Sequence, residues 1–208
     1  AHHPNKFKQI KEQAEVYKSE FDIETELYSK EEFNKFGHGG NEQFGALSYK
    51  PGFAINPLKF VNGITKYALS KKLKIFEHTL VDKINKNNGY YTLKSKEGSV
   101  KAKKVVVATN GFYQEGLVPQ LNSRILPVIS NIIVTRKLTD KEVDLHNFKT
   151  FSPIVNTKNL LYYYRKLPDN RILFGTRGDF IGSDQSNLDR AKIMEKFFKN
   201  IFPDWASI

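Results

Sequence analysis

The chain has 208 residues, of which 39% are hydrophobic, and a formal net charge of +11. This length suits one large or two small domains with a buried core. Cysteine is absent, which excludes disulfides, zinc–thiolate sites and a cysteine nucleophile and fits a reducing, cytoplasmic location. No apolar run reaches the roughly 18 residues of a transmembrane helix, so we expect no membrane span.

The positive charge suggests an anionic partner, such as nucleic acid, a membrane surface or a phosphate-bearing cofactor. The alternative is a solvated, lysine-rich surface without a partner. Lysines lie along the whole chain, and only "SKKLK" and "KAKK" are dense runs. No zinc-finger or RNP-like motif accompanies them, so the sequence predicts no nucleic-acid partner.

The first predicted elements are two helices. Apolar residues recur at spacings of three to four over residues 4–20, which predicts a helix. A second, short helix is expected in "YSKEEF", where Ser29 is the N-cap and Glu32 its capping-box partner.

A strand and a loop follow in the prediction. Asp22, Glu24 and Glu26 alternate along "FDIETEL", which predicts three acids on one face of an edge strand; binding of a cation or polyamine is the alternative. The segment "FGHGGNEQFGALSYKPGF" has the glycines and proline of a loop. His38 in this loop is interpreted as a solvent-exposed histidine.

The middle of the chain predicts a helix and a meander. "INPLKFVNGITKYALSKKL" is amphipathic, with Asn56 as N-cap and Pro57 at the first helical position. "KIFEHTLVDKI", "YYTLKS" and "VKAKKVVVA" predict three strands joined by turns. The last of these runs into "ATNG", so a buried strand is expected to stop abruptly at a small, polar corner.

The last third predicts more antiparallel structure. "SNIIVTRKL" is read as a strand, "TDKEV" as a capped helical turn and "NLDRAKIMEKFFKNIF" as a helix. "NLLYYYRKLPDNRILFGTR" predicts a hairpin around a turn at Pro168 and Asp169. The order of elements indicates an α+β fold with a largely antiparallel sheet and flanking helices.

Several motifs, taken in order, resemble one family. "VVVATNGFY", "LVPQL", "RILPVISNIIVT" and "LYYYRKLPDNRILFGTR" are similar to segments of the D-amino-acid-oxidase (DAO) family of FAD-dependent oxidoreductases. The resemblance is strongest to the gamma-glutamylputrescine oxidase branch and covers nearly the whole chain. Each motif alone is moderately specific, and their order carries the resemblance.

The resemblance implies FAD as cofactor. In the family, the valine strand lies in the FAD-binding sheet and its end faces the dinucleotide, where small residues allow close backbone approach. A cofactor-binding role is therefore implied for Val81, Ala108, Thr109, Asn110 and Gly111. The alternative is a core strand followed by an ordinary Asn-Gly turn.

The resemblance also implies substrate contacts in "LLYYYRKL". Strand alternation places Tyr163 and Arg165 on one face. Arg165 matches a family position that in some members holds a substrate carboxylate, and Tyr163 is a pocket-lining candidate; a salt bridge and sheet packing are the alternatives. Arg177 is a weaker candidate. The sequence assigns no catalytic residue and no metal site.

The chain departs from the family in one respect. The G-x-G-x-x-G fingerprint is absent, because Gly37, Gly39 and Gly40 lack a preceding strand and a following helix. The C-terminal flavin segment is also missing. We therefore expect the chain to be an internal fragment of a longer protein. Residues of about 40–72 and 125–208 are expected to belong to the substrate-binding side. Residues of about 73–115 are expected to form a partial β-meander of the FAD-binding domain. Alone, it is expected to lose FAD and activity, and to self-associate through exposed strand edges.

Three functions remain open at this point. The leading hypothesis is a flavin-dependent oxidoreductase that oxidises the C–N bond of a small amine or amino acid by hydride transfer to FAD. The alternative is a non-catalytic binding module of the same fold, with a basic surface for an anionic ligand or partner. Nucleic-acid binding through charge alone is a third, less favoured reading, which predicts a steep salt dependence.

Overall fold

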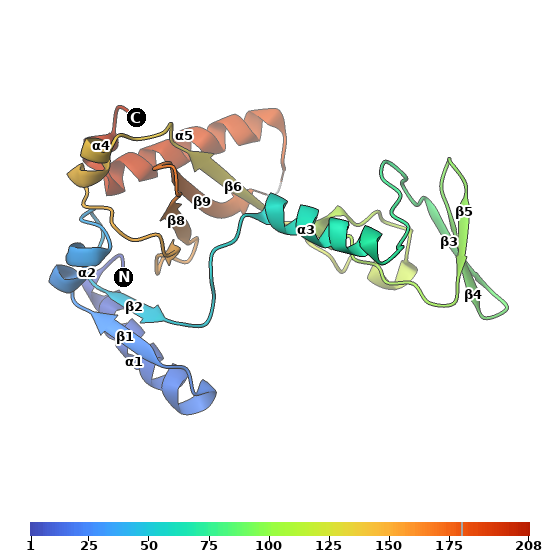
Figure 1. Cartoon of the computed structure of the whole chain (residues 1–208), viewed down its shortest axis with the longest axis horizontal. Coiled ribbons are helices and arrows are strands. Elements are labelled where there is room, and N and C mark those ends of the chain that lie inside the picture. The colour runs from blue at the N-terminus through green and yellow to red at the C-terminus, as the bar shows by residue number, and fades with distance from the viewer. Residues whose placement is uncertain (180) are drawn as a thin grey trace. The chain divides into compact units, whose positions relative to one another are not determined.

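A computed structural model describes residues 1–179 and 181–208 (Figure 1). The chain divides into two compact units. The first, here the sheet unit, comprises residues 1–54 and 129–208; the second, the meander unit, comprises residues 55–128. These limits differ from the predicted ones, since the helix after residue 56 belongs to the meander unit. The assignment of one unit to substrate binding and of the other to FAD binding remains a prediction.

The sheet unit is built on a four-stranded antiparallel sheet in the order β6-β9-β8-β7. Its strands are β6 (Ile129–Val134), β7 (Ile154–Val155), β8 (Tyr162–Lys166) and β9 (Ile172–Asp179). β8 and β9 form the predicted hairpin, closed by hydrogen bonds between Leu167 and Arg171 (2.7 Å) and between Asn170 and Leu167 (3.0 Å). The local turn chemistry therefore predicted this pairing correctly.

One face of this sheet carries the hydrophobic core. Helix α5 (Asp184–Ile201) runs alongside β6 and β9 (Figure 1), and the turn η3 (Pro203–Trp205) follows it. The buried apolar side chains of the core are Leu138, Val143, Phe148, Tyr162, Tyr164, Ile172, Phe174, Met194, Phe198, Ile201, Phe202 and Trp205. Since the core residues of β8 and β9 are even-numbered, the odd-numbered residues point to the opposite face.

The N-terminal part of the sheet unit is a helical and two-stranded layer. It contains α1 (Pro4–Phe21), β1 (Thr25–Tyr28), α2 (Lys30–Phe36) and β2 (Ala46–Tyr49), with β1 and β2 antiparallel. Ser29 caps α2 and Glu32 completes the capping box, as predicted. The edge-strand prediction was partly wrong, because Asp22 ends α1 in a left-handed conformation and β1 begins after Glu24.

Helix α4 (Asp140–Leu145) confirms the predicted capped turn. Thr139 and Glu142 form a capping box, and Arg136 binds the Glu142 carboxylate at 2.7 Å. The Arg136 guanidinium and the Thr139 groups lower the pKa of Glu142 to about 2. Glu142 therefore stays ionised as N3 residue of the helix, where negative charge is favourable.

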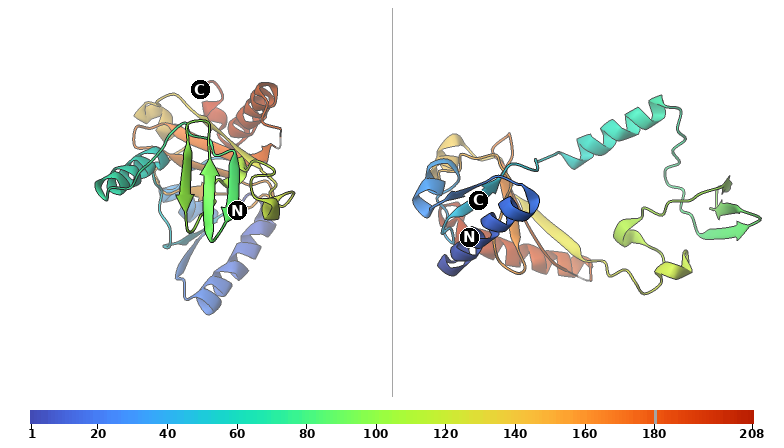
Figure 2. Two further views of the ribbon diagram at one scale, coloured as in Figure 1. Left: turned by 90° about the vertical axis from the view of Figure 1, so that its right-hand side faces the viewer. Right: turned by 90° about the horizontal axis from the view of Figure 1, so that it is seen from below.

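The meander unit contains α3 (Pro57–Ser70) and an antiparallel meander of β3 (Lys83–Asn87), β4 (Tyr90–Lys94) and β5 (Ser99–Ala102) (Figure 2). Asn56 caps α3 and Pro57 starts it, as predicted. The apolar stripe of α3 is exposed: Leu58, Val61 and Ile64 are each more than half accessible.

Two predicted strands are absent or shortened in the described chain. Residues 104–109, which include all three valines of "VVVATNG", form no strand, and Val106 is 87% exposed. "KIFEHTLVDKI" becomes a strand only from Lys83 onward. A strand needs a neighbour to take its backbone hydrogen bonds, and in the described chain no strand lies beside these valines.

The structure has the predicted α+β class, with mainly antiparallel sheets and flanking helices. None of the helices within the described residues combines the length and apolarity required to cross a bilayer.

Candidate functional site

The face of the large sheet opposite the core is the candidate substrate site. Strand register places Tyr163 beside Gly175, and Gly175 beside Ile132 on β6. Two residues further along in either direction, Arg165 and Arg177 lie on the same face. This surface, here called the open face, is only partly covered: Tyr163 and Arg165 are half-buried, and Ile132 and Arg177 are exposed.

Tyr163 is held flat across β9 by its neighbours. Its hydroxyl lies 2.5 Å from the Ser130 Oγ of β6, so the ring spans from β8 over β9 to β6. This path crosses Gly175, where a Cβ atom would come within 2.2 Å of the Tyr163 ring. Glycine in this strand therefore marks a close approach of a side chain to the backbone.

This geometry predicts the effect of Gly175→Ala. The added methyl group meets the far end of a flexible side chain, so the Tyr163 ring is expected to swing away and to release Ser130. The free energy of unfolding should change by less than about 1 kcal/mol. NMR of the Tyr163 ring signals, identified by comparison with Tyr163→Phe, measures the displacement. Unchanged ring signals would contradict the contact.

Arg165 and Tyr163, the predicted substrate-binding residues, thus share one face of β8, as strand alternation required. Arg165 lies beside Leu173, and Arg177 beside Ser130, toward opposite ends of the same pair of strands. None of the ion pairs recorded for residues 1–179 and 181–208 includes Arg177. The open face therefore combines guanidinium groups, hydroxyls and apolar side chains.

His38 belongs to the core, and its interpretation as a solvent-exposed loop histidine was wrong. Its side chain is 0% exposed. The Nδ1 atom accepts a hydrogen bond from the Gly40 N–H (3.1 Å), and Nε2 therefore donates to the Tyr164 hydroxyl (3.0 Å). Burial lowers the pKa of His38 to about 3. A neutral histidine with both nitrogens engaged has a structural role here.

The predicted cofactor-binding residues lie in the meander unit. Val81 is half-buried in an irregular segment, and Ala108, Thr109 and Asn110 are exposed. The chain turns here without the buried strand that was predicted to precede the corner: Asn110 begins a short 3-10 turn (Asn110–Phe112) and adopts a positive φ of 51°, a conformation that asparagine tolerates. The Phe112 N–H donates to the Thr109 carbonyl (3.0 Å). Small exposed side chains leave this backbone open to a ligand, so the segment fits a dinucleotide that approaches main-chain atoms.

The glycine-rich loop around His38 cannot cradle a phosphate. The Gly39 N–H donates to the His146 carbonyl and the Asn41 N–H to the Ile201 carbonyl, each at 2.7 Å. Gly40 donates to His38, and a Cβ there would approach the Ile201 carbonyl to 2.8 Å. These amides already have acceptors within the protein, which agrees with the prediction that this loop is no dinucleotide fingerprint.

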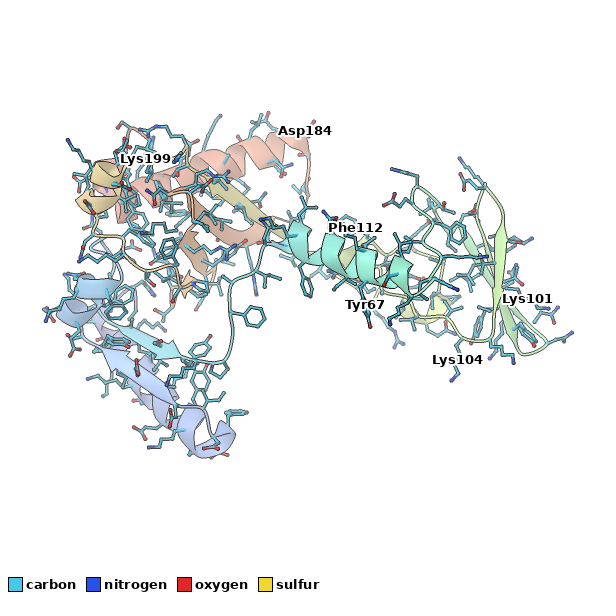
Figure 3. All side chains as sticks on the ribbon, in the orientation of Figure 1. Tyr67, Lys101, Lys104, Phe112, Asp184 and Lys199 are labelled. Carbon is cyan, nitrogen blue, oxygen red and sulfur yellow. The ribbon has the colours of Figure 1, made fainter. Side chains whose placement is uncertain are left out.

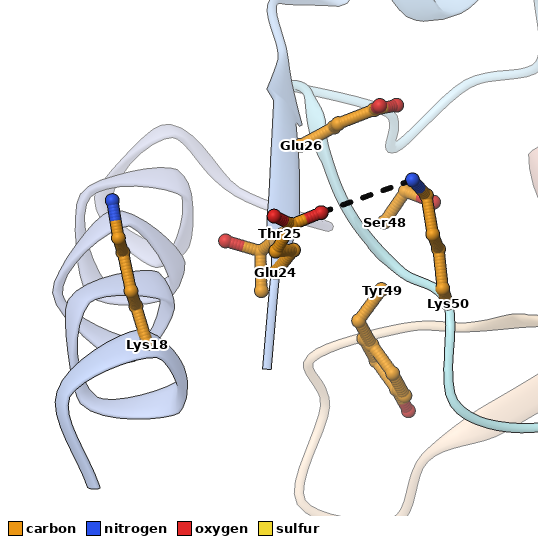
Figure 4. A pocket seen from close by; sticks show the side chains of 7 residues that line it. All are labelled: Lys18, Glu24, Thr25, Glu26, Ser48, Tyr49 and Lys50. Atoms are coloured by element: carbon orange, nitrogen blue, oxygen red, sulfur yellow. Dashed lines mark ion pairs between the residues drawn. The ribbon is translucent and has the colours of Figure 1, made fainter. Parts of the chain in front are cut away.

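A surface cavity of about 330 Å³ lies elsewhere in the sheet unit (Figure 4). It is lined by Lys18, Glu24, Thr25, Glu26, Ser48, Tyr49 and Lys50. Glu24 pairs with Lys50 at 3.9 Å, and Glu26 accepts a hydrogen bond from the Tyr28 hydroxyl. Because both acids have partners and two lysines line the same cavity, the polyamine interpretation of these acids gains no support. In the described residues, no group of three metal-binding side chains is present.

The sequence did not single out Ser130 or Gly175. Ser130 is one of two neighbouring polar residues, with Asn131, near the start of β6. Gly175 lies in the interior of a predicted strand. A glycine in that position is a known signal for close approach. Which side chain approaches the glycine depends on how the neighbouring strands pair, and the sequence does not show that pairing.

Comparison with known proteins by sequence gives a consistent result. The family model described as DAO, FAD dependent oxidoreductase, matches residues 1–208. A probable oxidoreductase, OrdL, from Haemophilus influenzae is 29% identical over 157 residues, covering 74% of this chain and 35% of the relative. Gamma-glutamylputrescine oxidoreductase from Escherichia coli is 27% identical over 159 residues, which cover 76% of this chain and 36% of the relative. The chain thus matches about a third of the length of these relatives.

Solved structures share the fold. Glycine oxidase from Geobacillus kaustophilus superimposes with a TM-score of 0.70 at 15% identity, over 97% of this chain and 52% of that protein. L-α-glycerophosphate oxidase from Mycoplasma pneumoniae with FAD bound superimposes with a TM-score of 0.67 at 19% identity, over 97% of this chain and 54% of that protein.

Proposed function

Because the chain belongs to the DAO family of FAD dependent oxidoreductases, we propose that its protein oxidises the C–N bond of a small amine or amino acid. FAD supplies the hydride acceptor, and the substrate leaves as an imine that water hydrolyses. The observation that carries the proposal is the open face, where Tyr163 and Arg165 lie side by side along β8. The similarity in sequence to gamma-glutamylputrescine oxidoreductase, which is named for an amine substrate, supports this class of reaction.

The roles of the chain's residues follow from their chemistry. The planar guanidinium of Arg165 suits a bidentate contact to a substrate carboxylate. Tyr163, oriented by Ser130 and Gly175, would form a fixed aromatic wall beside the reacting amine. Apolar side chains such as Ile132 border the open face; once substrate and flavin cover them, they would help to exclude water and so strengthen the charged contact.

FAD would contact Val81 and the corner from Ala108 to Gly111. We propose that these residues supply only part of its site, so the 208-residue chain alone should neither retain FAD nor turn over substrate. Adding FAD to this chain and following flavin fluorescence measures retention. Tight binding by the isolated chain would contradict this part of the proposal.

The reaction itself is tested on the protein expressed from its complete gene. Its visible spectrum should show bound flavin, and anaerobic addition of amines or amino acids should bleach it. Glycerol phosphate and hydroxy acids serve as matched substrates with a C–O bond in place of the C–N bond. Bleaching by these alone would contradict amine oxidation while leaving the flavin assignment intact.

Arg165→Lys tests the carboxylate contact in that protein. Lysine retains the charge but loses the planar fork. Loss of charged hydrogen bonds worth about 1.5–3 kcal/mol should raise KM roughly 10- to 150-fold for substrates with a carboxylate. Little change is expected for amines that lack one. An equal rise for both classes would show that Arg165 acts on the fold rather than on the carboxylate.

A further inference from the structure

The positive charge of the chain is concentrated in the meander unit. Residues 55–128 hold thirteen lysines and arginines against four acids, which is +9 of the total +11. All five ion pairs recorded for the described residues lie in the sheet unit. The basic residues of the meander unit are thus not balanced by carboxylates of their own unit.

Strand register sorts the meander into two chemically different faces. One face holds Ile84, Tyr91, Leu93, Val100 and Ala102, with Lys86 beside them. The other, here called the basic face, holds Lys83, Asn85, Asn87, Tyr90, Thr92, Lys94, Ser99 and Lys101. The basic face contains no acid and no aliphatic residue, so packing does not explain its composition.

Lysines on the basic face oppose one another. Lys83 and Lys94 are direct cross-strand partners, and both are exposed. Like charges in this position destabilise a strand pair. The Nζ atom of Lys101 lies 4.6 Å from the centre of the Tyr90 ring, which places a third ammonium group near an exposed aromatic ring. Figure 3 labels Lys101 on the meander. An anionic partner would convert this repulsion into attraction.

The composition of the basic face points to one kind of polyanion. Single-stranded nucleic acid is bound by sheet surfaces that combine basic groups for phosphates with aromatic rings for stacking bases. Tyr90 supplies the ring, and Asn85 and Thr92 supply hydrogen-bonding groups between the lysines. Stable membrane attachment needs an apolar anchor in addition to charge, and this face has none. The sequence predicted no nucleic-acid partner because it contains no recognised nucleic-acid-binding motif. From the sorting of residues on the strands we propose the opposite: the basic face of the meander binds single-stranded nucleic acid, independently of any flavin chemistry.

The test uses the 208-residue chain and a fluorescein-labelled oligothymidylate. Fluorescence anisotropy over a series of NaCl concentrations gives the slope of log K against log salt. Each phosphate neutralised contributes about −0.7 to this slope for a single strand. Replacing Lys83, Lys94 and Lys101 by Gln should therefore make the slope less negative by about 2. Circular dichroism checks that the variant is folded.

A control variant distinguishes the face from net charge. Lys59→Gln, Lys66→Gln and Lys74→Gln remove the same charge from exposed positions in and just after α3. The slope should then stay unchanged; an equal effect of the two triple variants would overturn the proposal. Tyr90→Leu should leave the slope intact while weakening binding about 5- to 150-fold, because stacking contributes about 1–3 kcal/mol per base.

Two other polyanions decide the class of partner. Polyglutamate carries charge without bases, and vesicles of phosphatidylcholine and phosphatidylserine carry charge on a membrane. Weaker binding to both than to oligothymidylate supports the proposal. Equal binding of polyglutamate, or binding to vesicles without binding to the oligonucleotide, overturns it.

Discussion

Trp205→Ala is expected to destabilise the sheet unit by about 3–5 kcal/mol, the usual cost of removing a large buried aromatic ring. The Trp205 side chain is 0% exposed. Its ring packs against Phe202 at a centroid distance of 4.9 Å and against His146 at 4.8 Å. Its Nε1 atom also donates to the Glu142 carbonyl (2.6 Å), so the substitution leaves both a cavity and an unpaired acceptor.

Urea unfolding followed by far-ultraviolet circular dichroism measures this loss. The free energy of unfolding of a typical domain is about 5–15 kcal/mol, so the variant should lie close to its unfolding threshold. Phe53→Ala is the matched control in the same unit, since Phe53 is 86% exposed and should change stability by no more than about 0.5 kcal/mol. A Trp205→Ala loss below about 1 kcal/mol would contradict the packing around η3. Because Trp205 is the single tryptophan, its fluorescence reports unfolding of this region in the parent protein.

Local sequence patterns predicted the local structure well. The capping boxes at Ser29 and Thr139, and proline at the start of α3, depend on residues within four positions of each other. The β8–β9 hairpin is specified by its own turn. In these places the interaction that stabilises the element is encoded in one short stretch, so the sequence alone is sufficient.

Predictions failed where a residue depends on distant parts of the chain. The valines before Ala108 have high strand propensity, yet propensity does not provide the neighbouring strand that pairs with them. His38 was read as exposed because its flanking glycines indicate a loop. Its burial depends on Phe148, Tyr164 and Phe202, which are more than 100 residues away.

The candidate site shows the same limit. Alternation correctly placed Tyr163 and Arg165 on one face of β8. It did not show that Ser130 and Gly175 orient the Tyr163 ring, since that arrangement requires the register of β6, β9 and β8. The lysines likewise looked spread along the whole chain; only the division into units and the pairing of the strands showed a basic face on the meander.

The stability of the sheet unit is expected to fall as the pH is lowered below about 6.5, because of His38. Burial lowers its pKa from 6.5 to about 3, so the folded protein resists a proton that the unfolded chain accepts. The contribution of neutral His38 to the free energy of unfolding is therefore fully present above pH 6.5, and it is lost progressively as the pH falls toward 3. At pH 4.5, which is two units below 6.5, the free energy of unfolding is lower by about 3 kcal/mol.

Other groups act in the same pH range, so a variant must isolate His38. Burial lowers the pKa of His146 and brings that of the Ala1 amino group to about 6. Both groups remain in His38→Gln, whose neutral amide can still donate a hydrogen bond to the Tyr164 hydroxyl. Subtracting the pH dependence of the variant from that of the parent protein therefore leaves the contribution of His38. The low pKa of Glu142 lowers stability mainly below about pH 5. Glu142 also remains in His38→Gln, so its contribution cancels in the same subtraction.

The measurement is the free energy of unfolding in urea at several pH values for both proteins. The parent should lose about 3 kcal/mol more than His38→Gln between pH 8 and pH 4.5. If the variant is too unstable to measure, NMR of the His38 ring gives a second readout: its signals should not titrate down to pH 4.5 in the folded protein. Parallel pH profiles, or a ring that titrates near pH 6.5, would mean that His38 is accessible to water. The core around Tyr164 would then be more open than its contacts indicate.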